Sequence, residues 1–271
     1  MKVLITGNSG YIGSHLTQLL LEKTDYTVHG VDIAHPKAWL HRQYTKDITR
    51  KIPPSGYDCI IHLAGLVRVN ESVRDPLSYY TTNVSGTANL LKTDTKNFIF
   101  ASTGAAYAPT SPYALSKVMA EDVVRASRNG KDHSIFRFYN VVGKCPYAPT
   151  NTDGLMYNLM EARRLNKPIT IHGGDYATRD GTAQRNYVHV NEVCHALMQA
   201  IEQPANSPYE NLGRKHGHTV AEVVNAYNRA NGCDVPIVYG PRREGDISCS
   251  VMDKVSDYMQ ELYGIDEMMR D

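Results

Sequence analysis

Several features that mark other classes of protein are missing from this sequence. Its five cysteines are scattered and form no C-x-x-C pair, which argues against a disulfide framework and against a zinc site. No apolar run approaches the roughly 20 residues of a membrane span. With 29 basic and 28 acidic residues the net charge is +1, which gives no support to a nucleic-acid or membrane-surface partner. We therefore expect a globular cytoplasmic protein that recognises anions only through local groups.

The part of the sequence most similar to a metal-binding motif is the Lys-His-Gly-His run at 215–218. A metal site also needs acids or cysteines that converge on the same point, and none accompanies this run. A surface loop is the favoured interpretation, and we expect no metal ion.

The first sixteen residues, MKVLITGNSGYIGSHL, are the most informative stretch. An apolar run, Lys2–Thr6, predicts a buried strand, and apolar residues at helical spacing follow from Ile12. The turn between them carries Gly7, Gly10 and Gly13 at G-x-x-G-x-x-G spacing. Glycines let the backbone approach a pyrophosphate closely, and the amides at a helix start favour its negative charge. The turn therefore predicts a dinucleotide phosphate site.

Asp32 closes a second predicted strand, Tyr26–Asp32, 19 residues past Gly13. That separation is near the ~20 residues expected for the acid that binds the adenosine ribose. A carboxylate there accepts hydrogen bonds from the ribose hydroxyls and repels a 2′-phosphate, and residues 33–35 include no arginine. The sequence thus favours NAD over NADP, and the alternative is an ordinary strand–turn–helix without a ligand.

Strand-like runs then alternate with helical patterns, which predicts a Rossmann-type doubly wound parallel sheet of the α/β class. The predicted strands are Tyr57–Leu63, Asn97–Ser102 and Ser134–Phe138, and the helices are Leu77–Leu91 and Tyr113–Arg128. Two further helices, Asn191–Gln203 and Thr219–Ala230, and a strand at Pro236–Tyr239 complete the chain. We predict a nucleotide-binding domain at 1–140, joined by about 187–203, and a smaller α/β substrate lobe at 141–186 and 204–271.

Tyr113 and Lys117 form a predicted acid/base pair, because their i, i+4 spacing puts both on one face of a helix. A nearby lysine cation favours the phenolate of a tyrosine whose ordinary pKa is ~10. The preceding strand ends in Ser102 and Thr103, so a hydroxyl can emerge beside the phenol. Thr103, Tyr113 and Lys117 are therefore a candidate triad for moving a proton off a hydroxyl as a hydride leaves the same carbon. The alternative is a helix-capping aromatic beside a turn residue.

With these motifs the chain resembles the extended short-chain dehydrogenases/reductases, and specifically the UDP-glucose (UDP-galactose) 4-epimerase family, almost end to end. The resemblance implies that NAD contacts the glycine turn together with Tyr11, Ile12, Asp32, Asp47, Ile48, Leu63, Ala64, Gly65, Asn83, Ser102, Tyr113, Lys117 and Tyr139. It also implies a homodimer formed by the helices at 77–91 and 113–128.

The C-terminal segments GGDYATRDGTAQRNYVHVNEV, YENLG and PRREGD are similar to the family's nucleotide-sugar segments. Arginine suits the diphosphate of such a substrate, because its planar fork binds phosphate oxygens in pairs. The resemblance implies these roles: Arg185 and Arg243 at the diphosphate, Asp246 at the nucleoside ribose, Asn140 at the diphosphate or sugar, and His172 stacked on the base.

The implied reaction is epimerisation at C4 of a nucleotide sugar. Tyr113 takes the proton of the sugar O4, the C4 hydride passes to NAD, and the resulting 4-keto sugar receives the hydride back on its other face. Thr103 would bind O4, and Lys117 would also anchor the nicotinamide ribose. Two alternatives stay open: a reductase or dehydrogenase that exchanges its nicotinamide, and a non-catalytic NAD-binding module.

This sequence differs from the family pattern at several positions, and these differences bear on which substrate is bound. Gly104-Ala105-Ala106 follows Thr103 where the related 4,6-dehydratases have an Asp-Glu pair, so dehydration is disfavoured. Val67 stands where a lysine is usual, and Ala105 stands where a hydroxyl residue is usual. The loop from Ala108 to Ser111 is short, the helix expected after Asp47 is nearly absent, and the segment after Gly143 is shorter than usual.

Overall fold

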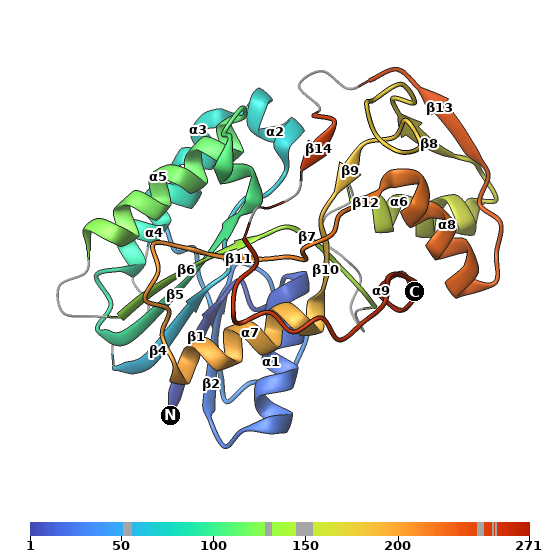
Figure 1. Ribbon diagram of the computed structural model, residues 1–271. Coiled ribbons are helices and arrows are strands. Elements are labelled where there is room, and N and C mark those ends of the chain that lie inside the picture. Colours follow the sequence, from blue (N-terminus) through green and yellow to red (C-terminus); the bar gives the residue numbers. More distant parts are fainter. Residues whose placement is uncertain (51–55, 128–131, 145–153, 243–246, 251, 253) are drawn as a thin grey trace. The chain divides into compact units, whose positions relative to one another are not determined.

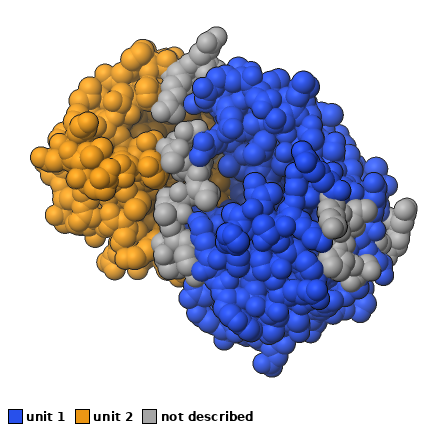
Figure 2. All heavy atoms as spheres, turned by 180° about the vertical axis from the view of Figure 1, so that it is seen from behind, with its two compact units in different colours: residues 1–138, 194–211 blue, residues 139–193, 212–271 orange. Residues whose placement is uncertain are grey.

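The computed structural model describes residues 1–50, 56–127, 132–144, 154–242, 247–250, 252 and 254–271. The chain divides into two compact units, which Figure 2 shows in different colours. Unit 1 comprises Met1–Phe138 and Cys194–Asn211, and unit 2 comprises Tyr139–Val193 and Leu212–Asp271. The chain therefore enters each unit twice.

A seven-stranded sheet with the order β11-β6-β5-β4-β1-β2-β3 forms the centre of unit 1. Its strands are β1 (Lys2–Thr6), β2 (Thr27–Asp32), β3 (Arg42–Thr45), β4 (Tyr57–His62), β5 (Thr95–Thr103), β6 (Asp132–Phe138) and β11 (Glu210–Leu212). Strands β1 to β6 pair in parallel, with Ile5 opposite both Gly30 and Ile61. The chain runs outward from β1 in one direction through β2 and β3 and in the other through β4, β5 and β6. This is the doubly wound α/β sheet that the sequence predicts.

Helices cover both faces of this sheet: α1 and α7 lie on one face, and α4 and α5 lie on the other, with α2 and α3 beside α5 (Figure 1). Their bounds are α1 (Tyr11–Lys23), α2 (Val69–Arg74), α3 (Pro76–Tyr79), α4 (Gly86–Leu90), α5 (Pro112–Ala126) and α7 (Val190–Glu202). The inner strands are apolar on both faces, as a covered parallel sheet requires. Leu4, Ile60 and Phe98 are fully buried in the core that results.

The predicted helix Leu77–Leu91 is not continuous. A π-helical turn, η1 (Tyr80–Ser85), separates α3 from α4. Asn83 lies in this turn and is buried, with its side chain bound to the loop after β4. Single π-helical turns occur mostly where function or packing displaces one residue from the regular helix, and this one carries a predicted cofactor residue.

Strand β3 is absent from the sequence prediction. Its residues Arg42–Thr45 are polar and half-exposed, and they become a strand by pairing with β2, where Gln43 lies opposite Gly30. Such a pairing depends on distant residues and leaves no local pattern. Beyond it, residues 47–50 form turns, and Lys51–Pro54, where the family helix is expected, lie outside the described residues.

The described residues of unit 2 form three small sheets with the orders β10-β7, β12-β9-β14 and β13-β8. Its strands are β7 (Asn140–Val142), β8 (Ile169–His172), β9 (Gln184–Arg185), β10 (Tyr187–His189), β12 (His218–Thr219), β13 (Ile237–Gly240) and β14 (Cys249–Ser250). Helices α6 (Leu155–Leu165), α8 (Val220–Asn231) and α9 (Ile265–Met268) accompany them. Leu159, Val223, Tyr227 and Met268 are fully buried in the core of this unit.

Two further observations bear on the classes considered from the sequence. Within the described part of the chain, no helix is long and apolar enough to span a membrane. The same residues bring no three histidine, cysteine, aspartate or glutamate side chains together in a way that could hold a metal ion.

Candidate active site

The glycine turn joins β1 to α1 in a conformation that requires glycine. Gly7 has φ +75°, and a Cβ there would lie 2.6 Å from the amide nitrogen of Ala64. A Cβ on Gly13 would collide with the Gly7 carbonyl oxygen, so α1 can start this close to the turn only with glycine at that position. Gly10 is the N-cap, and no side chain of the described residues caps α1. The turn is a cradle of backbone amides of the kind that binds phosphate.

Asp32 lies at the carboxyl end of β2, beside this turn. Its carboxylate accepts hydrogen bonds from the amide of Ser9 at 3.0 Å and from the amide of Ala34 at 2.9 Å. These two bonds hold one carboxylate oxygen toward the glycine turn and the other toward the loop after β2. An acid held in this way beside a phosphate cradle fits the adenosine ribose of a dinucleotide.

The loop after β4 carries three predicted cofactor residues, Leu63, Ala64 and Gly65, and Asn83 clamps its next residue. The amide of Leu66 donates to Asn83 Oδ1 at 2.9 Å, and Asn83 Nδ2 donates back to the Leu66 carbonyl at 3.0 Å. A Cβ on Gly65 would lie 2.9 Å from Asn83 Oδ1 and 3.7 Å from Lys117 Nζ. The structure therefore brings Gly65, Asn83 and Lys117 together.

Thr103, Tyr113 and Lys117 come from β5 and α5. Thr103 ends β5, and its hydroxyl oxygen accepts from the amide of Ala105 at 3.2 Å. The same hydroxyl lies close enough to the Tyr113 phenol to act on the pKa of that phenol. Helix α5 begins at Pro112 with Ser111 as its N-cap, so Tyr113 and Lys117 lie one turn apart near its start. The contact between Thr103 and Tyr113 is the one that the predicted triad requires.

Burial sets the proton affinities in this triad. Burial raises the pKa of Tyr113, and the hydrogen bond with Thr103 opposes that rise. The net direction is opposite to the one expected from a lysine cation alone, because loss of water outweighs the other effects on the phenol. Burial likewise lowers the pKa of Lys117 to about 8, while the Glu121 carboxylate acts to raise it. At neutral pH Tyr113 is therefore a phenol, and Lys117 is mostly a cation, 4.6 Å from the centre of the Phe100 ring.

Glu121 is a site residue that the sequence analysis missed. It lies one further turn along α5 from Lys117 and is fully buried. Its carboxylate accepts a 2.6 Å hydrogen bond from Ser102 Oγ and two from the Arg137 guanidinium at 2.8 and 2.7 Å. Burial acts to raise its pKa, but the bonds from Arg137 and Ser102 lower the pKa on balance. The signal was a Tyr-x-x-x-Lys-x-x-x-Glu stripe on one helical face, of which only the first two residues were used.

Ser102 is also predicted to contact the cofactor. Its hydroxyl donates to the Glu121 carboxylate and thereby links the end of β5 to α5.

Three other predicted cofactor residues make contacts within the protein. Asp47 accepts from the amide and hydroxyl of Thr49 at 2.8 and 2.7 Å, and these bonds lower its pKa. Ile48 is buried against Gly86. Tyr139 is the first residue of unit 2, and its amide donates to the Leu212 carbonyl.

In unit 2, Asn140 and Arg185 both contact backbone carbonyls. Asn140 Nδ2 donates to the Asn186 carbonyl at 2.8 Å. Arg185 Nη1 donates to the carbonyls of Gln184 and Ile247 at 2.9 and 2.8 Å, in the region where β9 pairs with β14.

His172 ends β8 opposite Gly240 of β13, and its Nδ1 lies 3.2 Å from the Pro241 carbonyl oxygen. Arg243 and Asp246, the other two predicted substrate residues, lie outside the described residues. Their predicted roles stay predictions.

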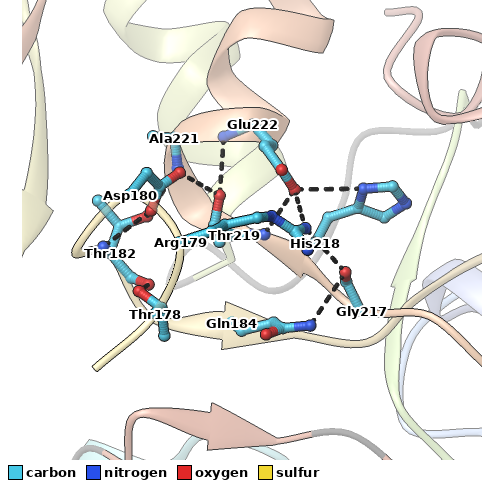
Figure 3. Close-up of polar contacts among 10 residues, drawn as sticks. All are labelled: Thr178, Arg179, Asp180, Thr182, Gln184, Gly217, His218, Thr219, Ala221 and Glu222. Atoms are coloured by element: carbon cyan, nitrogen blue, oxygen red, sulfur yellow. Dashed lines mark hydrogen bonds and ion pairs between the residues drawn. The ribbon is translucent and has the colours of Figure 1, made fainter. Parts of the chain in front are cut away.

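Arg179, the other arginine of the segment GGDYATRDGTAQRNYVHVNEV, makes contacts that stabilise the fold (Figure 3). Arg179 binds the Glu222 carboxylate and the Gly217 carbonyl, and Glu222 also accepts from the amide of Thr219 at 3.0 Å. Thr219 Oγ1 accepts in return from the amide of Glu222 at 3.2 Å, which completes a capping box at the start of α8. Residues 178–184 of the predicted substrate segment therefore stabilise the start of α8, and this leaves Arg185 as the arginine of that segment with a predicted ligand role.

Comparison with known proteins agrees with this arrangement. Residues 3–213 match the model of the NAD dependent epimerase/dehydratase family. The chain is 33% identical to UDP-glucose 4-epimerase 4 of Oryza sativa subsp. japonica, across 99% of this chain and 88% of that protein. It is 32% identical to UDP-glucose 4-epimerase of Erwinia amylovora, across 100% of this chain and 96% of that protein. The chain belongs to the NAD dependent epimerase/dehydratase family.

Solved structures show the same likeness. The UDP-glucose 4-epimerase from Bifidobacterium longum, solved in complex with NAD+ and UDP, superposes with a TM-score of 0.85 at 28% identity, over 99% of this chain and 96% of that one. The UDP-glucose 4-epimerase from Brucella ovis, in complex with NAD, gives a TM-score of 0.85 at the same identity and coverage.

The residues of unit 1 fit NAD as the cofactor. The glycine cradle suits its pyrophosphate, and Asp32 suits an unphosphorylated ribose. The cluster of Gly65, Asn83 and Lys117 lies where the carboxyl ends of neighbouring parallel strands meet, which is where this fold binds nucleotides. Family membership and site geometry thus agree on NAD.

Proposed function

We propose that this protein is an NAD-dependent nucleotide-sugar 4-epimerase that interconverts UDP-glucose and UDP-galactose. The observation that carries the proposal is the proximity of Thr103 and Tyr113, with Lys117 one helical turn further along α5, at the carboxyl edge of a sheet that also holds the glycine cradle. Its relatives over nearly the whole chain are named UDP-glucose 4-epimerases, which supports the choice of sugar.

The side chains of unit 1 supply proton transfer and orientation. Thr103 positions the sugar O4 by a hydrogen bond. The phenolate form of Tyr113, which is the minor form at neutral pH, receives the O4 proton as the carbon becomes a ketone and returns it on the way back. Lys117 stabilises the phenolate through its positive charge, which is strong because both groups are removed from water. Bound NAD supplies a reversible hydride acceptor for C4. The reaction would involve no net oxidation, so the protein would not have to exchange its cofactor.

The side chains of unit 2 would hold the nucleotide. Arg185 binds the diphosphate, Asn140 donates to the diphosphate or sugar, and His172 stacks on the base. Arg185 is supported by its fixed position, since two backbone carbonyls hold its guanidinium at the end of β9. Arg243 is proposed at the diphosphate and Asp246 at the ribose by sequence similarity alone.

We also propose a homodimer formed through α2, α3 and α5. These helices carry exposed apolar side chains at Val69, Val73, Leu77, Leu115 and Met119, which are between 42% and 74% exposed. Clustered exposed apolar side chains of this kind mark contact surfaces. Light scattering at micromolar concentration should report twice the 30.2 kDa chain mass. Leu77→Glu with Leu115→Glu should return the single-chain mass.

A cytoplasmic location is proposed as well. It is supported by the cysteines, since Cys59, Cys194, Cys233 and Cys249 are all free thiols. Fractionation of cells that express the protein from its own gene tests it.

The direct test is an assay of the purified protein with UDP-galactose and no added NAD, with the product sugar identified by nuclear magnetic resonance. Inversion at C4 with retained NAD supports the proposal, and the same assay with UDP-N-acetylgalactosamine and a GDP-sugar ranks the substrates. A protein that loses its nicotinamide on gel filtration and turns over only with added cofactor is instead an exchanging dehydrogenase. Stoichiometric NAD without turnover of any nucleotide sugar would refute the epimerase.

A further inference from the structure

His62 is a buried histidine that the proposed mechanism does not use. It ends β4, immediately before the cofactor loop Leu63–Gly65, and is 1% exposed. Burial, together with the smaller effect of the Lys117 cation, lowers its pKa to about 3. The imidazole is therefore neutral at every pH at which an enzyme of this kind works, and it serves as one hydrogen-bond donor and one acceptor.

Two threonine hydroxyls take up both ring nitrogens. Thr6 Oγ1, at the end of β1, lies 2.7 Å from His62 Nδ1, and Thr87 Oγ1, in α4, lies 2.9 Å from His62 Nε2. Thr6, Thr87 and His62 are each at most 1% exposed. A histidine that bridges three separate elements in this way restrains all three.

The direction of each bond follows from its neighbours. Thr87 donates its proton to the Asn83 carbonyl at 2.6 Å, so its oxygen must accept the proton of His62 Nε2. Nδ1 is then the acceptor and takes the proton of Thr6 Oγ1, whose oxygen accepts in turn from the Ala64 amide at 3.3 Å. The structure thus assigns His62 to the Nε2–H tautomer within one relay from the Ala64 amide to the Asn83 carbonyl.

Both ends of this relay belong to the cofactor site. Ala64 is the residue that a Cβ on Gly7 would strike. Asn83 holds Leu66 by two hydrogen bonds, and its Nδ2 also donates to Ser116 Oγ at 2.9 Å. Ser116 in turn donates to the Tyr113 carbonyl at 2.7 Å. A shift of the relay therefore moves the glycine turn, the loop after β4 and the start of α5 together.

The ring face makes a second connection. Its centroid lies 5.5 Å from that of Phe100, whose ring lies 4.6 Å from Lys117 Nζ. The cation of the triad thus rests on a ring that His62 supports from within the core.

We propose that His62 is a positioning residue for NAD: as the neutral Nε2–H tautomer, with Thr6 and Thr87, it fixes the loop Leu63–Gly65 and Asn83 in the geometry that binds the cofactor. This role rests on the proposed function only in so far as NAD is the cofactor. It does not depend on which sugar is turned over.

Thr87→Val is the test, because it removes the hydroxyl that links His62 to Asn83 and keeps the size of the side chain. Thr95→Val is the matched control: Thr95 is also a buried threonine of unit 1 that donates to a backbone carbonyl, at 2.9 Å, but it lies at the far end of β5. Thr87→Ser keeps the hydroxyl and should rescue. Loss of one buried hydrogen bond corresponds to roughly a tenfold effect.

The expected result is that NAD leaves the Thr87→Val protein about tenfold faster than the wild type, while Thr95→Val and Thr87→Ser retain it. The amide of Leu66 should exchange with deuterium faster in Thr87→Val alone, and ¹⁵N shifts of His62 should report the Nε2–H tautomer in the wild type. Equal NAD retention and equal Leu66 exchange in the two valine variants would overturn the proposal, as would an Nδ1–H tautomer. A wild type that retains NAD but epimerises no sugar would refute the proposed function and leave this comparison intact.

Discussion

The residues predicted for the cofactor in unit 1 and those predicted for the substrate in unit 2 differ in how they are held. Asn83 and Lys117 are buried, and Asn83 binds two elements at once. Asn140, His172 and Arg185 are exposed or half-exposed, and each contacts a backbone carbonyl on one side. A buried network must be complete before a ligand arrives, whereas half-exposed donors can adapt to one. Substitutions should therefore affect cofactor retention and chemistry in unit 1, and substrate affinity in unit 2.

Tyr113→Phe should produce the largest effect, since it removes the hydroxyl of the proposed proton acceptor and little else. We expect kcat to fall by about 10³-fold, within the range of general acid–base catalysis, with NAD still bound. Because burial keeps the pKa of Tyr113 above its ordinary value, the phenolate fraction grows with pH from neutrality, and the wild-type rate should rise from pH 7 until Lys117, with a pKa of about 8, loses the charge that stabilises the phenolate. Tyr107→Phe is the control, since Tyr107 is 70% exposed in the turn that precedes α5. A Tyr113→Phe enzyme with normal turnover would contradict the catalytic role proposed for Tyr113 in unit 1.

Lys117→Met should change how stability depends on pH. The folded-state pKa of Lys117 is about 8, below its ordinary value of 10.5, so the unfolded chain binds more protons between these two values. Wild-type stability should therefore gain about 3 kcal/mol relative to the variant as the pH rises from 8 to 10.5. Urea unfolding of both proteins at pH 7.5, 9 and 10.5 measures it. A constant difference across these pH values would mean that the ammonium is not desolvated.

Gly7→Ala tests whether the close approach of the glycine turn to the loop after β4 matters beyond the backbone strain of a positive φ. Its Cβ would lie 2.6 Å from a backbone nitrogen, whereas a Cβ on Gly232, which also has a positive φ of +58°, meets nothing within 4 Å. Both variants carry the cost of a left-handed alanine, roughly 1 kcal/mol. We expect the free energy of unfolding of Gly7→Ala to be about 2 kcal/mol lower than that of Gly232→Ala, and we expect Gly7→Ala to lose NAD. Equal melting temperatures and equal NAD content would show that the turn relaxes without consequence.

The same contrast explains what could be predicted from the sequence. The apolar strands, the glycine turn and the pair Tyr113 and Lys117 leave patterns within a few residues of one another, and their elements agree with prediction. Strand β3 and the two-residue strands of unit 2 are defined by their partners and leave no such pattern. The π-helical turn that interrupts the helix predicted at 77–91 places Asn83 against Leu66, which lies 17 residues away. His62 was missed because a lone histidine in a strand becomes informative only when its partners are known, whereas Glu121 continues the helical stripe of Tyr113 and Lys117 and could have been found from its spacing.

Arg185→Lys should produce the smallest of these effects and tests the substrate side of the contrast. A lysine keeps the charge but cannot hold two carbonyls and a phosphate in one plane. We expect the KM for UDP-galactose to rise about tenfold with kcat within twofold of the wild type and NAD content unchanged.

Arg242→Lys is the matched control in the same unit. The Arg242 guanidinium donates to the Asp175 side chain at 2.8 Å and to the Asp175 carbonyl at 2.7 Å, and it stacks on the Tyr176 ring. Its replacement should change KM less than twofold. If Arg185→Lys instead lowers kcat or releases NAD, then the separation of cofactor and substrate roles between the two units fails, because a half-exposed side chain of unit 2 would be acting on the chemistry.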